Sequence, residues 1–119
     1  MQPDKHPYEL LTDKPAHTLM LFDSFIEQYK KIGDITVHPA KTMIGIANAH
    51  KRIAYVIQLG KNFIDVVFMF KQPYNYNLCF RKIAQVPGEE QYNHHLRMYE
   101  IEDMNEEVAG FMRLAYEGC

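Results

Sequence analysis

The chain has 119 residues, of which 47% are hydrophobic and 24% charged, and this composition is typical of one globular domain rather than a disordered chain. The formal net charge of -2 gives no overall positive field that would attract nucleic acid or an anionic membrane surface. No apolar run reaches the roughly 20 residues that cross a bilayer, and the first residues lack a signal-peptide core, so we expect a cytoplasmic protein.

The first half of the chain predicts an arm, a helix and a series of strands. Residues 1–14 are interpreted as an N-terminal arm, and residues 15–119 as a single α+β domain. A helix is expected from Pro15 to Gly33, because apolar residues recur at helical spacing between a tolerated N-terminal proline and a glycine that favours helix ends. Alternating and β-branched runs then predict strands at residues 35–38, 42–47, 52–59 and 62–70. Gly60 and Lys61 should form the tip of a hairpin.

The second half predicts two more strands and a final helix. The strands are expected at residues 78–86 and 92–101, with a turn at 87–90 between them. Asp103 is a candidate N-cap for a helix that ends at Gly118. Its apolar stripe, which should pack on the sheet, contains Val108, Phe111, Met112 and Ala115. This order predicts a two-layer sandwich, with a mostly antiparallel sheet of five or six strands and both helices packed on one face.

The strand at residues 62–70 is apolar on both of its alternating sides, which is unusual for an antiparallel sheet covered by helices on one face. One side carries Phe63, Asp65, Val67 and Met69, and the other carries Ile64, Val66, Phe68 and Phe70. We therefore interpret Phe63, Val67 and Met69 as an interaction face that something must cover. The alternatives are the N-terminal arm with the loop around Tyr74, a protein partner such as a second copy in a homodimer, and a small-molecule ligand.

Polar residues on the same strands could form a cluster on this face. Asp65 has opposite charge to Arg81 and Arg97 on later strands, and Tyr55 and His95 could join them. A carboxylate and guanidinium groups in an apolar surround describe either a structural ion pair or a ligand site. These five residues are the candidate ligand-binding or interaction residues.

No motif indicates a catalytic, metal or cofactor site. The six histidines show no HxH, HxxxH or HExxH spacing, and His94 and His95 should point to opposite faces of a strand, so no metal is expected. The glycines form no phosphate-binding loop, so no cofactor is expected. Cys79 and Cys119 have no CxxC spacing, and a disulfide between them is not expected. Scattered lysines with Tyr74 and Tyr76 are weak grounds for nucleic-acid binding, which we do not expect.

Several short segments together resemble a known family. They are residues 41–46, 53–56, 63–68, 95–98, 102–103 and 114–116. Over residues 15–117 they resemble the uncharacterised bacterial family called domain of unknown function 5655. The general layout is more distantly similar to the domain of unknown function 1801 family, which is typified by a frataxin-like iron-handling protein. The first resemblance implies a fold of this size and no established reaction, so it supplies no catalytic residue.

The sequence therefore predicts a protein of unknown function that acts as a small binding or interaction module. One sheet face would serve a partner, self-association or a small ligand. The alternative is a ligand-processing enzyme with a polar site around Asp65, Arg97 and His95. We favour the non-enzymatic interpretation, because no nucleophile with an adjacent base is visible in the sequence.

Overall fold

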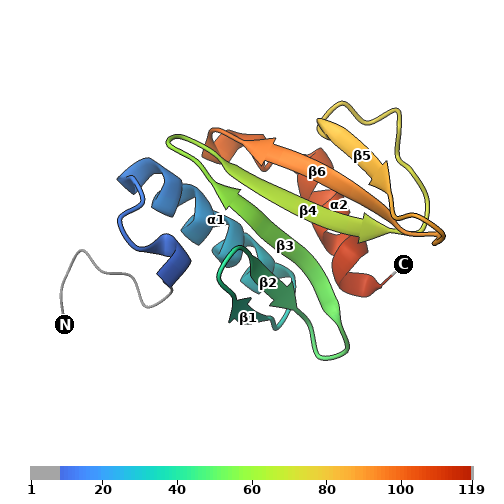
Figure 1. Cartoon of the computed structure of the whole chain (residues 1–119), viewed down its shortest axis with the longest axis horizontal. Coiled ribbons are helices and arrows are strands. Elements are labelled where there is room, and N and C mark those ends of the chain that lie inside the picture. Colours follow the sequence, from blue (N-terminus) through green and yellow to red (C-terminus); the bar gives the residue numbers. More distant parts are fainter. Residues whose placement is uncertain (1–8, 119) are drawn as a thin grey trace.

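The structure, a computed structural model, describes residues 9–118 and contains one antiparallel sheet with two helices on one of its faces (Figure 1). The six strands lie in the order β1-β2-β3-β4-β6-β5. They are β1 (Thr36–Pro39), β2 (Ile44–Ala47), β3 (Arg52–Leu59), β4 (Ile64–Phe70), β5 (Lys82–Gln85) and β6 (Tyr92–Met98). The helices are α1 (Ala16–Ile32) and α2 (Glu106–Glu117), and short 3-10 turns lie at Glu9–Leu11 (η1) and Ile101–Asp103 (η2). The predicted α+β sandwich is confirmed.

Helix α1 begins and ends where the sequence predicts. Pro15 occupies its N-cap and Gly33 its C-cap. Gly33 also makes room for α2, because a Cβ atom there would lie 2.4 Å from Oη of Tyr116 and would displace that ring. A second contact between the helices is the Tyr29 hydroxyl, which donates to the Met112 carbonyl at 3.0 Å. Burial raises the pKa of Tyr29, so this donor stays protonated.

Helix α2 begins two residues later than predicted. Its N-cap is Asn105, whose side chain accepts a hydrogen bond from the Val108 amide at 3.0 Å. Asp103 instead lies within η2 and completes the capping box of its N-cap Glu100, because the Asp103 carboxylate accepts from the amides of Tyr99 and Glu100. Both residues are good caps, and the extra turn before the helix decides between them. The predicted end at Gly118 is confirmed, with the left-handed backbone (φ 82°) that glycine adopts most easily.

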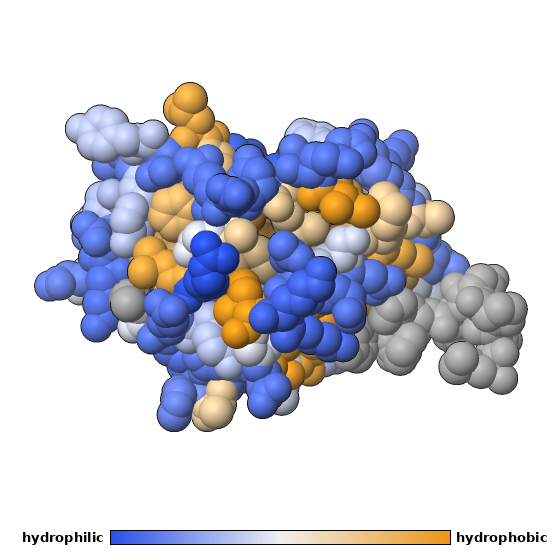
Figure 2. Space-filling view, turned by 180° about the vertical axis from the view of Figure 1, so that it is seen from behind, coloured by the Kyte–Doolittle hydropathy of each residue, from blue (hydrophilic) through white to orange (hydrophobic). Residues whose placement is uncertain are grey.

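The main core lies between the helices and the sheet. One alternating side of β4, which carries Ile64, Val66, Phe68 and Phe70, belongs to this core. Val108, Met112 and Ala115 of α2 are buried as predicted, whereas Phe111 is only half-buried. Seen from behind, the helix side presents a largely hydrophilic surface with smaller apolar areas between the polar side chains (Figure 2). The helices are therefore amphipathic covers of one sheet face.

The loop at residues 71–81 differs from prediction. The expected strand at 78–86 is shortened to Lys82–Gln85, and the residues before it form turns. Tyr74 packs edge-on against Phe70 and Phe111, on the helix side of the sheet. The interpretation that this loop closes over the opposite face is therefore wrong. Tyr76 and Leu78 are instead 98% and 95% exposed.

The described part of the predicted arm also packs on the core. Leu11 is fully buried in the cluster that the helices and sheet share. Residues 1–8 and Cys119 lie outside the described residues. The boundary between arm and domain at residue 15 stays a prediction.

Two turns position the strands that matter for the site. Between β5 and β6, the Glu89 amide donates to the Val86 carbonyl at 3.1 Å, with Pro87 and a left-handed Gly88 at the two central positions. This is the residue pattern of a type II turn, and it confirms the turn predicted at 87–90. The hairpin between β3 and β4 is closed by the Gly60 amide donating to the Phe63 carbonyl at 2.9 Å. Its tip is therefore Lys61 with Asn62, one residue later than predicted.

The final predicted strand is also shorter than expected, because β6 ends at Met98 and the chain turns into η2.

Within residues 9–118, no helix has the length and apolar character needed to cross a membrane.

Candidate functional site

The sheet face opposite the helices, called the open face here, carries neither helix (Figure 1). Strand pairing places one residue from each of five strands in a row across it. Gly45 pairs with Tyr55, Tyr55 with Val67, Val67 with His95, and His95 with Lys82. Directly paired residues on neighbouring strands lie on the same face of the sheet, so these residues from distant parts of the chain lie side by side on the open face.

A hollow of about 370 Å³ lies on the open face around this row. Its lining is mainly apolar on β3 and β4, and polar on β6. The lining residues are Met43, Tyr55, Ile57, Val67, Met69, Gln91, Asn93 and His95. The predicted interaction residues Val67 and Met69 are therefore brought together with Tyr55 and His95. A volume of this size is near the lower end of known small-molecule pockets.

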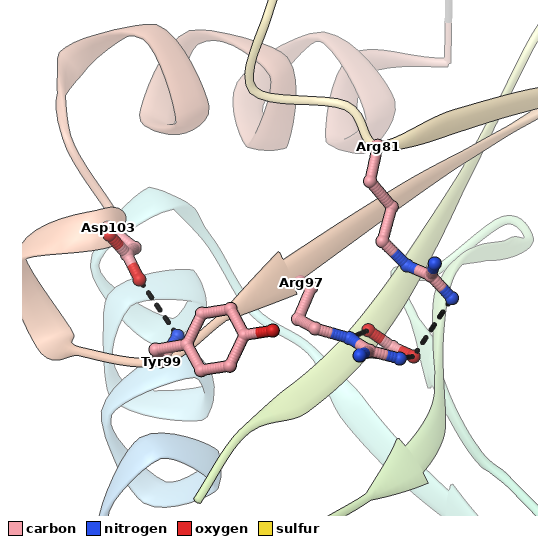
Figure 3. A network of polar contacts seen from close by, with 5 residues as sticks. Arg81, Arg97, Tyr99 and Asp103 are labelled. Atoms are coloured by element: carbon pink, nitrogen blue, oxygen red, sulfur yellow. Dashed lines mark hydrogen bonds and ion pairs between the residues drawn. The ribbon is translucent and has the colours of Figure 1, made fainter.

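The predicted ion cluster forms directly beside the hollow. Asp65 is 1% exposed, and its carboxylate accepts two hydrogen bonds from Arg97, from Nε at 2.7 Å and from Nη2 at 2.8 Å. Nη2 of Arg81 lies 3.5 Å from the same carboxylate. Arg81 approaches from the start of β5 and Arg97 from β6, and the two converge from different sides (Figure 3). The two-point geometry with Arg97 is the stronger of the two pairs.

Phe63 does not lie in the hollow with Val67 and Met69. It comes just before β4, and its ring stacks under the Arg97 guanidinium, 3.9 Å from the ring centroid to Cζ. Tyr99 packs beside it with its ring centroid 5.9 Å away. The hydrogen bonds of Arg97 to Asp65, and next to Tyr99, raise the pKa of Arg97 above its usual value. Phe63 thus supports the ion pair by a cation–π contact.

His95 stands between the hollow and the positive charges. Burial, and next the charges of Lys82 and Arg81, lower the pKa of His95 from its usual 6.5. The ring is therefore neutral at pH 7, and it can donate or accept a hydrogen bond at the edge of the hollow. Among residues 9–118, His95 has no side-chain hydrogen bond to Asp65 or Arg97, so the three do not form the bonded base and orienting group that catalysis by a triad requires.

His94 points to the opposite side, as the sequence predicts for adjacent strand residues. It is fully buried, its Nε2 accepts from the Tyr74 amide at 3.1 Å, and its Nδ1 is therefore the donor to the Tyr92 carbonyl at 2.9 Å. The rings of Phe70 and Phe80 pack edge-on against it, each with its centroid 4.9 Å away. Burial lowers the pKa of His94. This histidine is a structural anchor for the 71–81 loop, a role that the sequence alone did not indicate.

Other reactive groups in the described residues form no site. Cys79 is a free thiol, and burial, with a further effect of Glu107, raises its pKa to about 11, which leaves it protonated and unreactive. No group of three or more potential metal-binding side chains occurs within residues 9–118. The prediction that the protein holds no metal or cofactor stays a prediction.

A second hollow of about 470 Å³ adjoins the first at the end of β4 and shares Met69 and Gln91 with it. Both signs of charge line it, since Lys51, Arg52 and Lys71 face Glu89 and Glu90. Arg52 also reaches the open face, because a Cβ atom at Gly45 would lie 3.0 Å from its Nε. Sequence reasoning missed this region, because its lining comes from the ends of several strands and from α2.

Fold and site together define a small α+β domain that presents one hollowed sheet face. A family model described as "Domain of unknown function (DUF5655)" matches residues 9–118, and the chain belongs to this family. The resemblance seen in the sequence is thus confirmed, while the likeness to the domain of unknown function 1801 family stays a prediction. Neither the curated proteins nor the solved structures contain a match.

Proposed function

We propose that this protein is a binding module whose open face holds a small-molecule ligand in the hollow around Val67 and His95. The observation that carries the proposal is the hollow itself, with an apolar floor and polar groups at one edge. Small-molecule sites usually combine these two features. The helices that complete the core lie on the other face of the sheet (Figure 1), and on the open face Val67 at the floor of the hollow is 5% exposed while Met69, Ile57 and Tyr55 around it are half-buried.

A small ligand suits this face better than a second copy of the chain. The face is concave at its centre, and Arg81 and Lys82 beside the hollow have the same sign of charge. A twofold axis that passes close to this edge would bring the cationic side chains of the two copies near one another, which opposes association in that arrangement. A homodimer or another protein partner therefore remains an outcome of the experiment rather than the proposal.

Binding also suits the cluster better than catalysis. The Asp65 carboxylate is engaged by Arg97 and approached by Arg81, so it is not free to act as a general base. Arg97 is held in turn between Asp65 and the Phe63 ring. We therefore assign Asp65, Arg97 and Phe63 to holding the shape of the face, and Tyr55, Val67, Met69 and His95 to contact with the ligand.

The proposal is tested with Nile red, a neutral dye that fluoresces in apolar surroundings. The variant Met69→Trp should fill the hollow and abolish the dye signal. Met20→Trp is the matched control, because Met20 is an exposed methionine on α1. Equal dye binding by the native protein and Met69→Trp would refute the proposal. Sedimentation as a dimer that Val67→Glu dissociates would assign the face to self-association instead.

We further infer that the protein acts in the cytoplasm. The support is that Cys79, the cysteine within the described residues, is a free thiol, as expected where thiols are kept reduced. Secretion of the native protein into the medium or periplasm with a Cys79 disulfide would contradict this inference.

A further inference from the structure

The charges beside the hollow are unbalanced. Asp65 and Arg97 neutralise each other through their two hydrogen bonds. Arg81 is the second cation on the same carboxylate, at the longer distance of 3.5 Å, and its side chain is 47% exposed. Lys82 is exposed and, among residues 9–118, has no ion pair. Two positive charges are therefore left over at this edge.

Both surplus cations lie within reach of the hollow's polar edge. Lys82 pairs directly with His95, which lines the hollow. Burial first, and then the charges of Lys82 and Arg81, lower the pKa of His95, while the charge of Asp65 raises it, which is consistent with both cations lying near that side chain. On the far edge, Gly45 lets Arg52 and Tyr55 approach the sheet. Arg52 also lines the adjoining hollow together with Glu89 and Glu90, so Arg81 and Lys82 are the cations that a ligand in the first hollow would meet.

We propose that the ligand is a small organic anion with an apolar body. The apolar body would lie on Val67, Met69 and Ile57, and the acidic group would face Arg81 and Lys82 near His95. This inference rests on the proposed function and adds the ligand's chemical class to it. Moving an apolar group out of water is favourable in free energy, whereas a carboxylate is stabilised out of water only where cations surround it. The apolar floor and the cationic edge of the hollow therefore match the apolar body and the acidic group of such a ligand.

The match between site and ligand also explains why a second cation is present. A single arginine satisfies the buried Asp65 through two hydrogen bonds, so Arg81 is not needed to neutralise it. Arg81 remains half in solvent, where it can pair with an incoming anion without losing a short contact. The cost of moving Arg81 toward a ligand is therefore small.

The experiment compares two probes that differ in one group, decanoate and 1-decanol. Binding is followed by NMR of methionine methyl groups, because Met43 and Met69 line the hollow and Met20 on α1 does not. Both probes should shift Met43 and Met69 and leave Met20 unchanged. Decanoate should bind about tenfold more tightly than 1-decanol at low salt, and the preference should shrink as salt screens the charges.

Charge variants assign the preference to its source. Arg81→Gln with Lys82→Gln should weaken decanoate to the affinity of 1-decanol and leave 1-decanol unchanged. The matched control, Lys30→Gln with Lys31→Gln, removes the same charge from the last turn of α1 and should leave the preference intact. Both pairs are exposed, so the variants should fold, and an unfolding curve for each verifies it.

The outcomes separate this inference from the proposed function. Equal affinities for decanoate and 1-decanol at Met43 and Met69 would overturn the anionic ligand and leave the binding module standing. No shift of Met43 or Met69 with either probe would overturn both. Broadening of the same two signals with protein concentration alone would assign the hollow to a second copy, and would likewise overturn both.

Discussion

Asp65 offers a direct test of what holds the open face together. Replacing it with asparagine keeps the shape of the side chain but removes the charge from a group that is 1% exposed. Breaking a buried ion pair typically costs about 3 to 5 kcal/mol when a bare charge stays buried. Here the guanidinium groups left behind belong to Arg97 and Arg81, whose side chains are 24% and 47% exposed and can turn toward water. The cost should therefore be nearer about 2 kcal/mol.

This loss is measured by urea unfolding, and a thermal melt should show Tm lowered by roughly 8 °C. Asp23→Asn is the matched control, since Asp23 is exposed on α1 and its loss should change stability by less than about 0.5 kcal/mol. Arg97→Met should destabilise the protein more than Asp65→Asn, because it leaves the buried carboxylate with the distant Arg81 alone. If Asp65→Asn is as stable as the native protein, or if Arg97→Met is the milder variant, the ion cluster does not stabilise the fold.

Three further predictions concern other parts of the molecule. Phe111→Ala should lower the free energy of unfolding by about 2 kcal/mol, less than the loss at a fully buried phenylalanine, because Phe111 packs on Tyr74 and Phe80. The control Leu78→Ala, in the exposed loop, should leave the free energy of unfolding almost unchanged. A loss under about 1 kcal/mol for Phe111→Ala would show that α2 does not anchor the loop. Because burial lowers the pKa of His94, this histidine takes up a proton at a higher pH in the unfolded chain than in the folded one. Neutral His94 therefore contributes its full stabilisation above about pH 6.5, and that contribution is lost as the pH falls through the folded pKa. His94→Gln, which can still accept from the Tyr74 amide, should reduce the stability difference between about pH 7.5 and about pH 5, and an unchanged difference would contradict this role. Stoichiometric zinc, iron or copper should leave Tm unchanged, and a rise that disappears in His94→Ala or His95→Ala would reveal a metal site.

The sequence by itself determined the local elements and the two-sided character of β4. Helix α1 begins after Pro15 and α2 ends at Gly118, because proline and a left-handed glycine act through their own backbone preferences. The alternation along β4 placed Asp65, Val67 and Met69 on one face, since a strand's period is two whatever it pairs with. These features depend on near neighbours in the chain, so they can be predicted without the fold.

The tertiary structure alone decided which of those residues meet. Pairing of β4 with β6 rather than with β5 sets Asp65 opposite Arg97 and Val67 opposite His95, and no local pattern specifies that choice. It also decided that Tyr74 packs on Phe70 and Phe111 at the helix side of the sheet, so the loop does not cover the open face as the sequence suggested. The physical reason is that register and strand order follow from burying all core residues together. The free energy of this burial comes from contacts between distant residues, so no single segment of the chain contains it.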